Sequence, residues 1–454
     1  MKILDVTKSL CPYCFKRIDA DIVEDNGKIY MDKTCSDHGK VRVLIWSDAS
    51  TYQEWGKYSE HAPRNEGGHP TEKECPYDCG YCNEHRGSTC TSVIEVTKRC
   101  NMNCSVCFAS ANAIGDNLSL SKIQEMIDYV AETQGFCSLQ ISGGEPTLRD
   151  DLPEIVSYAK KIGFKHVQVN SNGIRLASDL AYVKSLADAG TDLIYLGFDG
   201  IDDGIYEKIR NRKMIDVKKG CIGNCEKAGI GVMLVPVIIK EENDDQIGKI
   251  VKFAKAHMPT VKGIHFQPAS TFGRYEMTEN HENRYTIPDL IHDLETQTDR
   301  EIIADYIVPR KKKSPYCSFS STYYLNFDNN LVALTRRDGN ISLKVPVMSN
   351  SKMEKFARNT NNFTEKYWKQ NSVEASNKDS ELATFSKRLR TYSLSISAMP
   401  FQDVWNIDIN RVKGCCVSVI HESLTTIPLC LNYLTDTKGR RLYEEGVCCY
   451  ESNK

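Results

Sequence analysis

Three cysteines stand close together in residues 97–111, TKRCNMNCSVCFASA. Cys100, Cys104 and Cys107 have the spacing C-x3-C-x2-C and directly follow an apolar, strand-like segment, SVIEVT. An iron–sulfur cluster normally takes four cysteine thiolates, so a loop with three leaves one iron without a protein ligand. An open position of this kind is where a metalloenzyme binds its substrate or cofactor. The loop therefore predicts a strand-borne iron–sulfur centre that binds a small molecule.

The rest of the composition describes a large, nearly neutral chain. It has 454 residues, enough for two or three domains, and a formal net charge of -2. This charge indicates no basic face for nucleic acid, and no apolar run approaches the roughly 20 residues needed to span a bilayer. The first residues lack the basic-then-apolar pattern of a signal peptide. We therefore expect a cytoplasmic protein that could meet membrane lipids only peripherally.

The chain has 19 cysteines, which gather in three zones. Clustered C-x2-C spacings in a large intracellular protein indicate metal rather than disulfides. In the first zone, Cys11 and Cys14 are separated from Cys35 and His38 by a predicted hairpin with an Asn-Gly turn at residues 26–27. This pattern predicts a zinc-ribbon or rubredoxin-type site for one zinc or iron ion, with His38 or a later cysteine as the fourth ligand. The alternative is a set of small buried cysteines beside a surface histidine.

A second cysteine set follows at Cys75, Cys79, Cys82 and Cys90. Its first three members repeat the C-x3-C-x2-C spacing, so spacing alone does not identify the open cluster. This set has a fourth cysteine at hand and follows a Gly/His/Pro linker rather than a strand. We interpret it as an auxiliary iron–sulfur cluster with four protein ligands, and a second zinc knuckle is the alternative.

The central part alternates short apolar runs with helical patterns, which predicts an α/β domain with a parallel sheet. Strands are expected at 92–97, 138–142, 166–170, 193–198, 232–238 and 264–267. Helices are expected at about 120–134, 151–162, 178–189, 218–228 and 244–257. Six β/α units suggest a partial barrel, in which ligands lie at the C-terminal ends of the strands.

Polar and glycine-rich segments follow these strands. Gly143 and Gly144 let the backbone approach a ligand closely, and Glu145 with nearby carbonyls is suited to an ammonium group. Amides after the third strand are suited to ribose hydroxyls. The candidate ligand-binding residues are Phe108, Gly143, Gly144, Glu145, Pro146, Asn170, Asn172, Asp199 and Gln267.

The last zone holds a further cysteine group after a polar stretch at residues 338–395, which we expect to form surface helices and loops or an insertion. One cysteine from each later pair together with Cys317 would make a four-thiolate site. Buried free cysteines or a redox pair are the alternatives. The candidates are Cys317, Cys415, Cys416, Cys430, Cys448 and Cys449. Three other cysteines, Cys137, Cys221 and Cys225, are expected to pack in the core.

The strand-borne loop ending in Phe108, followed by GGEP at residues 143–146 and NSNG at 170–173, resembles the radical S-adenosylmethionine (radical SAM) family. The resemblance implies a [4Fe-4S] cluster that binds SAM, with the GGE motif at its amino group and the sixth strand along its adenine. It also implies reductive cleavage of SAM to a 5′-deoxyadenosyl radical, which removes a hydrogen atom from an unactivated C–H bond. An electron donor such as ferredoxin or flavodoxin would be a partner. Auxiliary clusters near the C-terminus occur in several subfamilies.

The order of the cysteine motifs is similar to the subfamily that contains the archaeal tetraether lipid synthase, earlier assigned as a dihydropterin methyltransferase. The expected regions are a Cys-rich metal-binding region at 1–90, a partial (β/α)6 radical SAM barrel at 91–300, and a substrate and auxiliary-cluster region at 301–454. C–C coupling of lipid chains is the first expectation for the reaction. Radical methylation or other modification of a pterin, peptide or small metabolite is the second. A non-catalytic iron–sulfur electron-transfer protein is the alternative from another class.

Overall fold

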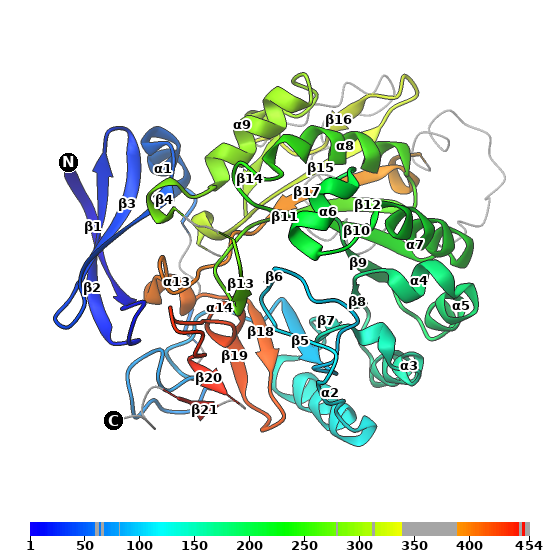
Figure 1. Ribbon diagram of the computed structural model, residues 1–454, viewed down its shortest axis with the longest axis horizontal. Coiled ribbons are helices and arrows are strands. Elements are labelled where there is room, and N and C mark those ends of the chain that lie inside the picture. Colours follow the sequence, from blue (N-terminus) through cyan, green and yellow to red (C-terminus); the bar gives the residue numbers. More distant parts are fainter. Residues whose placement is uncertain are drawn as a thin grey trace.

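The structure is a computed structural model that describes residues 1–59, 63–64, 68–80, 82–277, 280–310, 314–337, 388–444 and 447–449. Its N-terminal part is an antiparallel sheet with strands in chain order, at the left of Figure 1. The strands are β1 (Lys2–Leu10), β2 (Arg17–Asp25), β3 (Lys28–Cys35) and β4 (Gly39–Trp46), and helix α1 (Ala49–Gly56) follows them.

The predicted hairpin turn joins β2 to β3. Asn26 and Gly27 both have positive φ angles, 49° and 74°, and Asp25 pairs with Lys28 across the turn. Asparagine and glycine tolerate this left-handed backbone, which matches the twist of the flanking strands. The hairpin therefore brings the two ends of the ribbon, near Cys11 and Cys35, to the same side of the small sheet.

The central sheet contains six parallel strands that neighbour one another in chain order, with the connecting helices outside them (Figure 1). Their apolar runs are buried because helices and the sheet interior cover both faces. The strands are β5 (Thr91–Glu95), β7 (Ser138–Ser142), β8 (Val167–Ser171), β9 (Leu193–Gly197), β10 (Gly231–Val235) and β12 (Val261–Pro268). The principal helices are α2 (Leu120–Gln134), α3 (Leu152–Ile162), α5 (Leu180–Asp188), α7 (Ile215–Ala228) and α8 (Ile247–Ala256). The predicted α/β class with a parallel sheet is confirmed.

Strands from the last part of the chain extend this sheet at both edges. β17 (Ser393–Ala398) pairs in parallel with β12, and β18 (Val417–Ile420) pairs in parallel with β5. Antiparallel strands lie beyond them: β14 (Val308–Pro309), β15 (Phe319–Leu325) and β16 (Leu331–Ala333) on one side, and β19 (Thr426–Pro428) on the other. Residue 300 is therefore not the boundary of a separate sheet, because the C-terminal strands find their hydrogen-bond partners in the barrel.

The remaining helices and strands follow in chain order. They are β6 (Val106–Cys107), η1 (Pro146–Leu148), α4 (Ile174–Ser178), α6 (Asp203–Arg210), β11 (Val237–Ile238), η2 (Asp244–Gln246), β13 (Arg274–Tyr275), η3 (His281–Asn283), α9 (Ile287–Gln297), η4 (Ala304–Tyr306), η5 (Pro315–Cys317), α13 (Ile409–Val412), α14 (Leu429–Asn432), β20 (Tyr443–Glu444) and β21 (Val447–Cys448). Most of the predicted insertion, residues 338–387, lies outside the described residues.

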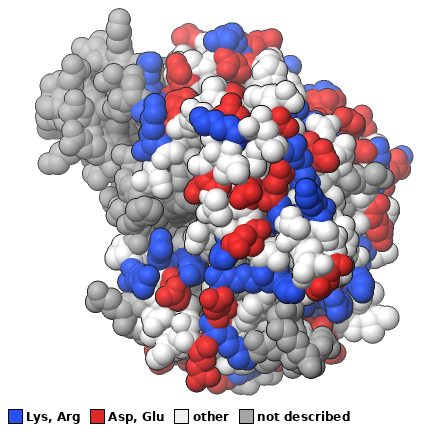
Figure 2. Space-filling view, turned by 90° about the vertical axis from the view of Figure 1, so that its left-hand side faces the viewer, with Lys and Arg blue, Asp and Glu red and all other residues white. Residues whose placement is uncertain are grey.

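The face seen from the left of Figure 1 carries charges of both signs, interspersed over its surface (Figure 2). Exposed ion pairs of the N-terminal sheet region include Lys8 with Asp19 and Lys16 with Asp37. Among the described residues, every helix is too short or too polar to cross a bilayer.

Candidate functional site

The three-cysteine loop faces a cavity of about 340 Å³ inside the sheet. Cys100, Cys104 and Cys107 all line it, together with the C-terminal ends of the parallel strands. Eight of the predicted ligand-binding residues also line it: Phe108, Gly143, Gly144, Glu145, Asn170, Asn172, Asp199 and Gln267. The ninth, Pro146, is buried at the start of η1, where it shapes the turn after Glu145. Phe108 packs edge-on against Tyr433, with ring centroids 4.7 Å apart.

Arginines from distant parts of the chain, Arg274 and Arg210 among them, hold the loop in place. Arg274 Nε donates to the Cys104 carbonyl at 2.6 Å, and Arg210 Nη1 donates to the Val106 carbonyl at 2.9 Å. The two-residue strand β6 also pairs with β13. These arginines were not predicted, because no local sequence signal marks a side chain that reaches a loop 104 or 170 residues away.

The cysteine side chains of this loop suit a cluster better than a single ion. Burial raises the pKa of Cys100 to about 12 and also raises that of Cys104, so bare thiolates would be costly there. Iron compensates such charge when it binds. Among the described residues, the N-terminal quartet is the only group of three or more ligand atoms within 4.8 Å of one another. The sulfurs of Cys100, Cys104 and Cys107 are more widely spaced than the ligand atoms of this quartet, as a cluster of several irons requires.

The glycines after β7 line the cavity and also allow a close backbone contact with the cysteine loop. A Cβ on Gly143 would lie 2.3 Å from the Thr97 carbonyl oxygen, and one on Gly144 would lie 2.1 Å from that of Arg99. Gly144 N donates to Thr97 O at 2.8 Å. Glycine is therefore needed because two backbone segments meet here, and this contact fixes the cysteine loop against the strand end.

Glu145 is almost fully buried and is held by the chain. Its Oε1 accepts from Thr147 and Ser171, whereas its Oε2 accepts only from Asn172 N, at 2.7 Å. Burial raises the pKa of this carboxyl above its usual value, and the hydrogen bonds oppose the rise. A cation at Oε2 would satisfy the remaining lone pair, so the carboxylate fits an ammonium group.

The amides at the end of β8 differ in their availability. Asn170 Nδ2 donates to Ser142 Oγ at 3.0 Å, but Asn170 Oδ1 is buried without a hydrogen-bond partner. An orphaned buried acceptor that lines the cavity fits a hydroxyl donor from a bound molecule. The side chain of Asn172, in contrast, is occupied by Asn101 and by the backbone of Ile174.

Asp199, which lines the cavity, also accepts hydrogen bonds from Arg210 at both of its carboxylate oxygens. The distances to Arg210 Nε and Nη2 are 2.7 and 2.8 Å, and Asp199 is 1% exposed. A second unpredicted cation, Lys218 on α7, reaches the same cavity and donates to Asn172 O at 2.6 Å. Burial lowers the pKa of Lys218 to about 8. Gln267, near the end of β12, lines the cavity and is anchored through its backbone N–H to Pro236 O.

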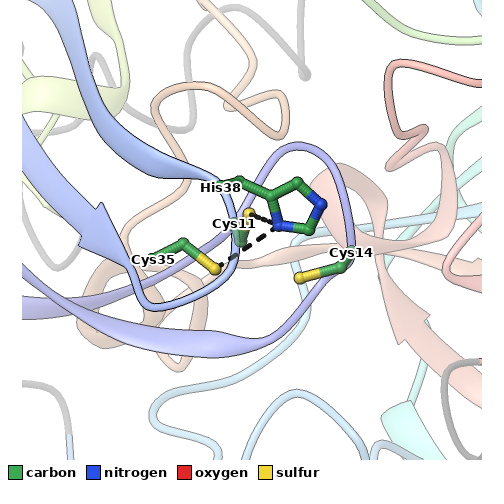
Figure 3. Close-up of side chains that lie close together, drawn as sticks. All are labelled: Cys11, Cys14, Cys35 and His38. Atoms are coloured by element: carbon green, nitrogen blue, oxygen red, sulfur yellow. Dashed lines mark hydrogen bonds between the residues drawn. The ribbon is translucent and has the colours of Figure 1, made fainter.

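The N-terminal quartet forms a compact site at the end of the small sheet (Figure 3). Cys11, Cys14, Cys35 and His38 place their ligand atoms within 4.8 Å of one another. His38 Nδ1 lies 3.7 Å from Cys11 Sγ and 3.6 Å from Cys35 Sγ. Three sulfurs and one imidazole nitrogen converging in this way fit a single zinc ion, with iron as the other metal that such a set can hold. His38, rather than a later cysteine, supplies the fourth ligand atom of this group.

The second cysteine set has another cysteine nearby besides the predicted Cys90. Cys75, Cys79 and Cys82 lie near one another, and Tyr443 stands among Cys75, Cys79 and Cys448. Tyr443 Oη also donates to the Pro76 carbonyl, which fixes the hairpin of β20 and β21 beside this set. The fold therefore brings Cys448 close to this set, and Cys448 becomes a candidate for its fourth ligand.

Cys90 instead lies beside the C-terminal group. Its Sγ is 2.6 Å from Cys416 Sγ, and its backbone N–H donates to Cys416 O at 2.7 Å. The parallel pairing of β5 with β18 places these residues side by side. A small pocket next to the main cavity is lined by Cys317, Cys415, Cys416 and Cys430. Four of the six predicted C-terminal candidates therefore line this pocket, and Cys448 and Cys449 do not.

The cysteines expected in the core are placed there or close to it. Cys221 and Cys225 are fully buried on α7, and Cys137 packs against the main core just before β7.

Comparison with known proteins places this site in a family. The model of the radical SAM superfamily matches residues 94–254, and that of the HMPTM N-terminal zinc ribbon domain matches residues 3–47. The chain is 34% identical to a 7,8-dihydro-6-hydroxymethylpterin dimethyltransferase of Methanocaldococcus jannaschii, over 93% of this chain and 92% of that protein. The chain belongs to the radical SAM superfamily. This radical SAM enzyme therefore uses a [4Fe-4S] cluster with SAM, and the alternative of a non-catalytic electron carrier is set aside.

More distant relatives of this radical SAM enzyme match a shorter part of it. A probable GTP 3′,8-cyclase of Methanococcus aeolicus is 26% identical over 55% of this chain and 86% of its own length. Among solved structures, Streptococcus suis SuiB bound to S-adenosylmethionine is 17% identical, with a TM-score of 0.40 over 47% of this chain and 48% of that chain.

Proposed function

We propose that this radical SAM enzyme functionalises a C–H bond of a compact, polar heterocycle of the pterin type, with methylation as the outcome. The name of the Methanocaldococcus jannaschii relative, similar along almost the whole chain, supports this substrate class. When bound, the cluster and SAM supply a 5′-deoxyadenosyl radical. The protein's part is to orient the substrate and keep water from the radical.

The observation that carries the proposal is a polar inner wall beneath the SAM site. The interior of a β/α barrel is normally filled by branched apolar side chains. Here, inward-facing polar residues on five strands line the cavity: Gln140, Gln168, Tyr195, His265 and Ser397. A substrate with hydrogen-bonding edges would match them, whereas a hydrocarbon would leave buried polar groups unpaired.

Hydrogen bonds fix the orientation of this wall. Gln168 Nε2 donates to Gln140 Oε1 at 2.5 Å, and His166 Nε2 lies 3.2 Å from Gln168 Oε1. On the other side, His265 Nδ1 and Ser397 Oγ are 2.8 Å apart. Such chains hold side-chain amides and rings in set directions, which is what recognition of a heterocycle's edge requires.

Other parts of the cavity lining are apolar, and this observation favours the second candidate, C–C coupling of lipid chains. These parts include Phe272, Phe319, Met399, Phe401 and Leu429. A planar heterocycle also needs apolar surface against its faces, so these parts are compatible with both substrates. The polar wall separates them, and we therefore place the pterin-type substrate first.

The residues around the cavity take complementary parts in SAM binding under this proposal. Cys100, Cys104 and Cys107 hold three irons of the cluster. Glu145 accepts from the amino group of SAM, and Lys218 provides the counter-charge for its carboxylate. The other residues predicted to bind SAM have supporting parts, and Asn170 among them offers its unpaired Oδ1 to the ribose. These residues are Phe108, Gly143, Gly144, Pro146, Asn170, Asn172, Asp199 and Gln267.

Two auxiliary iron–sulfur centres complete the proposal. One would be held by Cys75, Cys79, Cys82 and Cys448. The other would be held by Cys317, Cys415 and Cys430 with either Cys416 or Cys90 as the fourth ligand. Four thiolates saturate a cubane, so both centres would lack an open iron.

The proposal is tested with anaerobically reconstituted enzyme, a chemical reductant or reduced flavodoxin, and deuterated substrates. We expect 7,8-dihydro-6-hydroxymethylpterin to increase 5′-deoxyadenosine formation and to transfer deuterium into it. The variant Gln140→Leu should weaken this response, and Gln297→Leu, a change on α9 away from the cavity, should not. Deuterium transfer from an isoprenoid lipid but not from the pterin would overturn the pterin assignment in favour of the second candidate.

A further inference from the structure

One arginine stands beside the C-terminal cysteine group and forms no ion pair with a carboxylate of the described residues. Arg411, on α13, lines the small pocket that Cys317, Cys415 and Cys430 also line. Its Nη2 lies 3.3 Å from Cys317 Sγ and donates to the Tyr316 carbonyl at 3.1 Å. Its Nε is buried and has no hydrogen-bond partner.

This guanidinium lacks a neutralising ion pair within the described part of the chain. Other interior arginines have one: Arg210 pairs with Asp199, and Arg284 pairs with Asp403. The carboxylate of Asp408 caps the first turn of α13 and accepts from backbone N–H groups there. A cation taken out of water needs an opposite charge nearby, since its desolvation is otherwise uncompensated.

The cysteine group would supply that charge. Four thiolates around an iron–sulfur cubane carry a net negative charge in every common oxidation state, and Cys317 would be one of them. We propose that Arg411 is a positioning residue that balances this charge and sets the reduction potential of the C-terminal auxiliary centre. The inference rests on the auxiliary cluster of the proposed function.

The direction of the effect follows from electrostatics. Reduction adds an electron to an already anionic group, so a cation and a hydrogen bond at a ligand sulfur stabilise the reduced form. Arg411 therefore raises the reduction potential. The centre it acts on is next to the main cavity, because Ser318, Val417 and Leu429 line both spaces. Arg411 would therefore set the reduction potential of a centre that is separated from the substrate cavity by a single layer of side chains.

The test is a redox titration of the holoenzyme followed by electron paramagnetic resonance. The signal of this centre is identified as the one missing in Cys317→Ala. In Arg411→Gln we expect that signal to titrate at a lower midpoint potential, by at least tenfold in the equilibrium between oxidised and reduced forms, or about 59 mV for one electron. Arg411→Lys, which keeps the charge, should lie closer to the wild type. Arg300→Gln, which removes an exposed arginine of the pair with Glu295, should leave the midpoint unchanged.

Each result decides a separate point. An unshifted midpoint in Arg411→Gln overturns the role of the arginine while leaving the cluster in place. If Cys317→Ala keeps every signal and all its iron, the auxiliary centre itself is refuted. If Arg411→Gln loses the centre's iron while Arg411→Lys retains it, the charge is needed to hold the cluster, which supports the proposal. Equal loss of iron in both variants overturns it, because shape rather than charge would then matter.

Discussion

Arg210 and Asp199 form a bidentate ion pair inside the barrel, with nitrogen–oxygen distances of 2.7 and 2.8 Å. The same guanidinium donates to the Val106 carbonyl in the cysteine loop. Asp199 lies two residues after the end of β9 and Arg210 ends α6, so the pair joins the segment after the strand, the helix and the loop. The position of this ion pair implies that the cluster loop depends for its conformation on two residues that do not bind iron themselves.

Replacing Asp199 by asparagine should destabilise the enzyme strongly. The change preserves shape but leaves Arg210 as a buried, uncompensated charge, which costs about 3–5 kcal/mol. We expect a clear fall in Tm, measured anaerobically by differential scanning fluorimetry. Asp245→Asn is the matched control, since its pair with Lys249 is exposed and contributes only about 0.3–0.5 kcal/mol. Equal Tm values for the two variants would contradict the prediction.

Cys448 and Cys449 should differ in their effect on iron content. Cys448 lies with Cys75 and Cys79 around Tyr443, so Cys448→Ala should lower the iron bound per chain by up to about four atoms. Cys449→Ala, one residue further on, should retain the full complement. Iron and sulfide analysis after reconstitution distinguishes the two. Retention of iron in Cys448→Ala together with loss in Cys90→Ala would restore the arrangement predicted from the sequence.

The position of Cys90 shows where sequence reasoning ends. The strands, the ribbon hairpin and the three-cysteine loop were predictable because their signals are local: apolar runs, an Asn-Gly turn and close cysteine spacing. Cys90 was assigned to its nearest neighbours in the chain. The fold instead places it beside Cys416, because β5 accepts a parallel partner from more than 300 residues away.

The same limit applies to charged groups of the cavity. Asp199 is expected at the cavity because it follows a strand, and it lines the cavity, but its ion pair with Arg210 could not be predicted. Arg210, Lys218 and Arg411 reach their contacts across the tertiary structure, and nothing in their neighbouring residues marks them. For the same reason, the sequence indicated no contribution of the C-terminal strands to the barrel.

His38 should be required for the N-terminal metal. Its Nδ1 is the only nitrogen among the four ligand atoms within 4.8 Å of one another, and three thiols alone would hold the ion less tightly. We expect His38→Ala to lose one metal ion per chain, measured by mass spectrometry of metals, with iron–sulfur content unchanged. The control is His292→Ala, on the exposed side of α9. An unaltered metal content in His38→Ala would indicate that a later cysteine supplies the fourth ligand.

Lys218 should make SAM affinity depend on pH. Burial lowers its pKa to about 8, so its amine is charged below that pH and neutral above it. A charge-assisted hydrogen bond to the SAM carboxylate contributes roughly 1.5–3 kcal/mol, so Lys218→Met should weaken binding by more than about tenfold below pH 8. The ratio of the variant's Kd to that of the wild type should then approach one as the pH rises above 8. Because SAM titrates equally in both measurements, its own titration does not affect this ratio. Equilibrium binding measurements across this range provide the ratio, and Lys219→Met, which changes the exposed neighbour on α7, should keep it near one throughout. A ratio that stays high above pH 8 would show that Lys218 acts by packing rather than by charge.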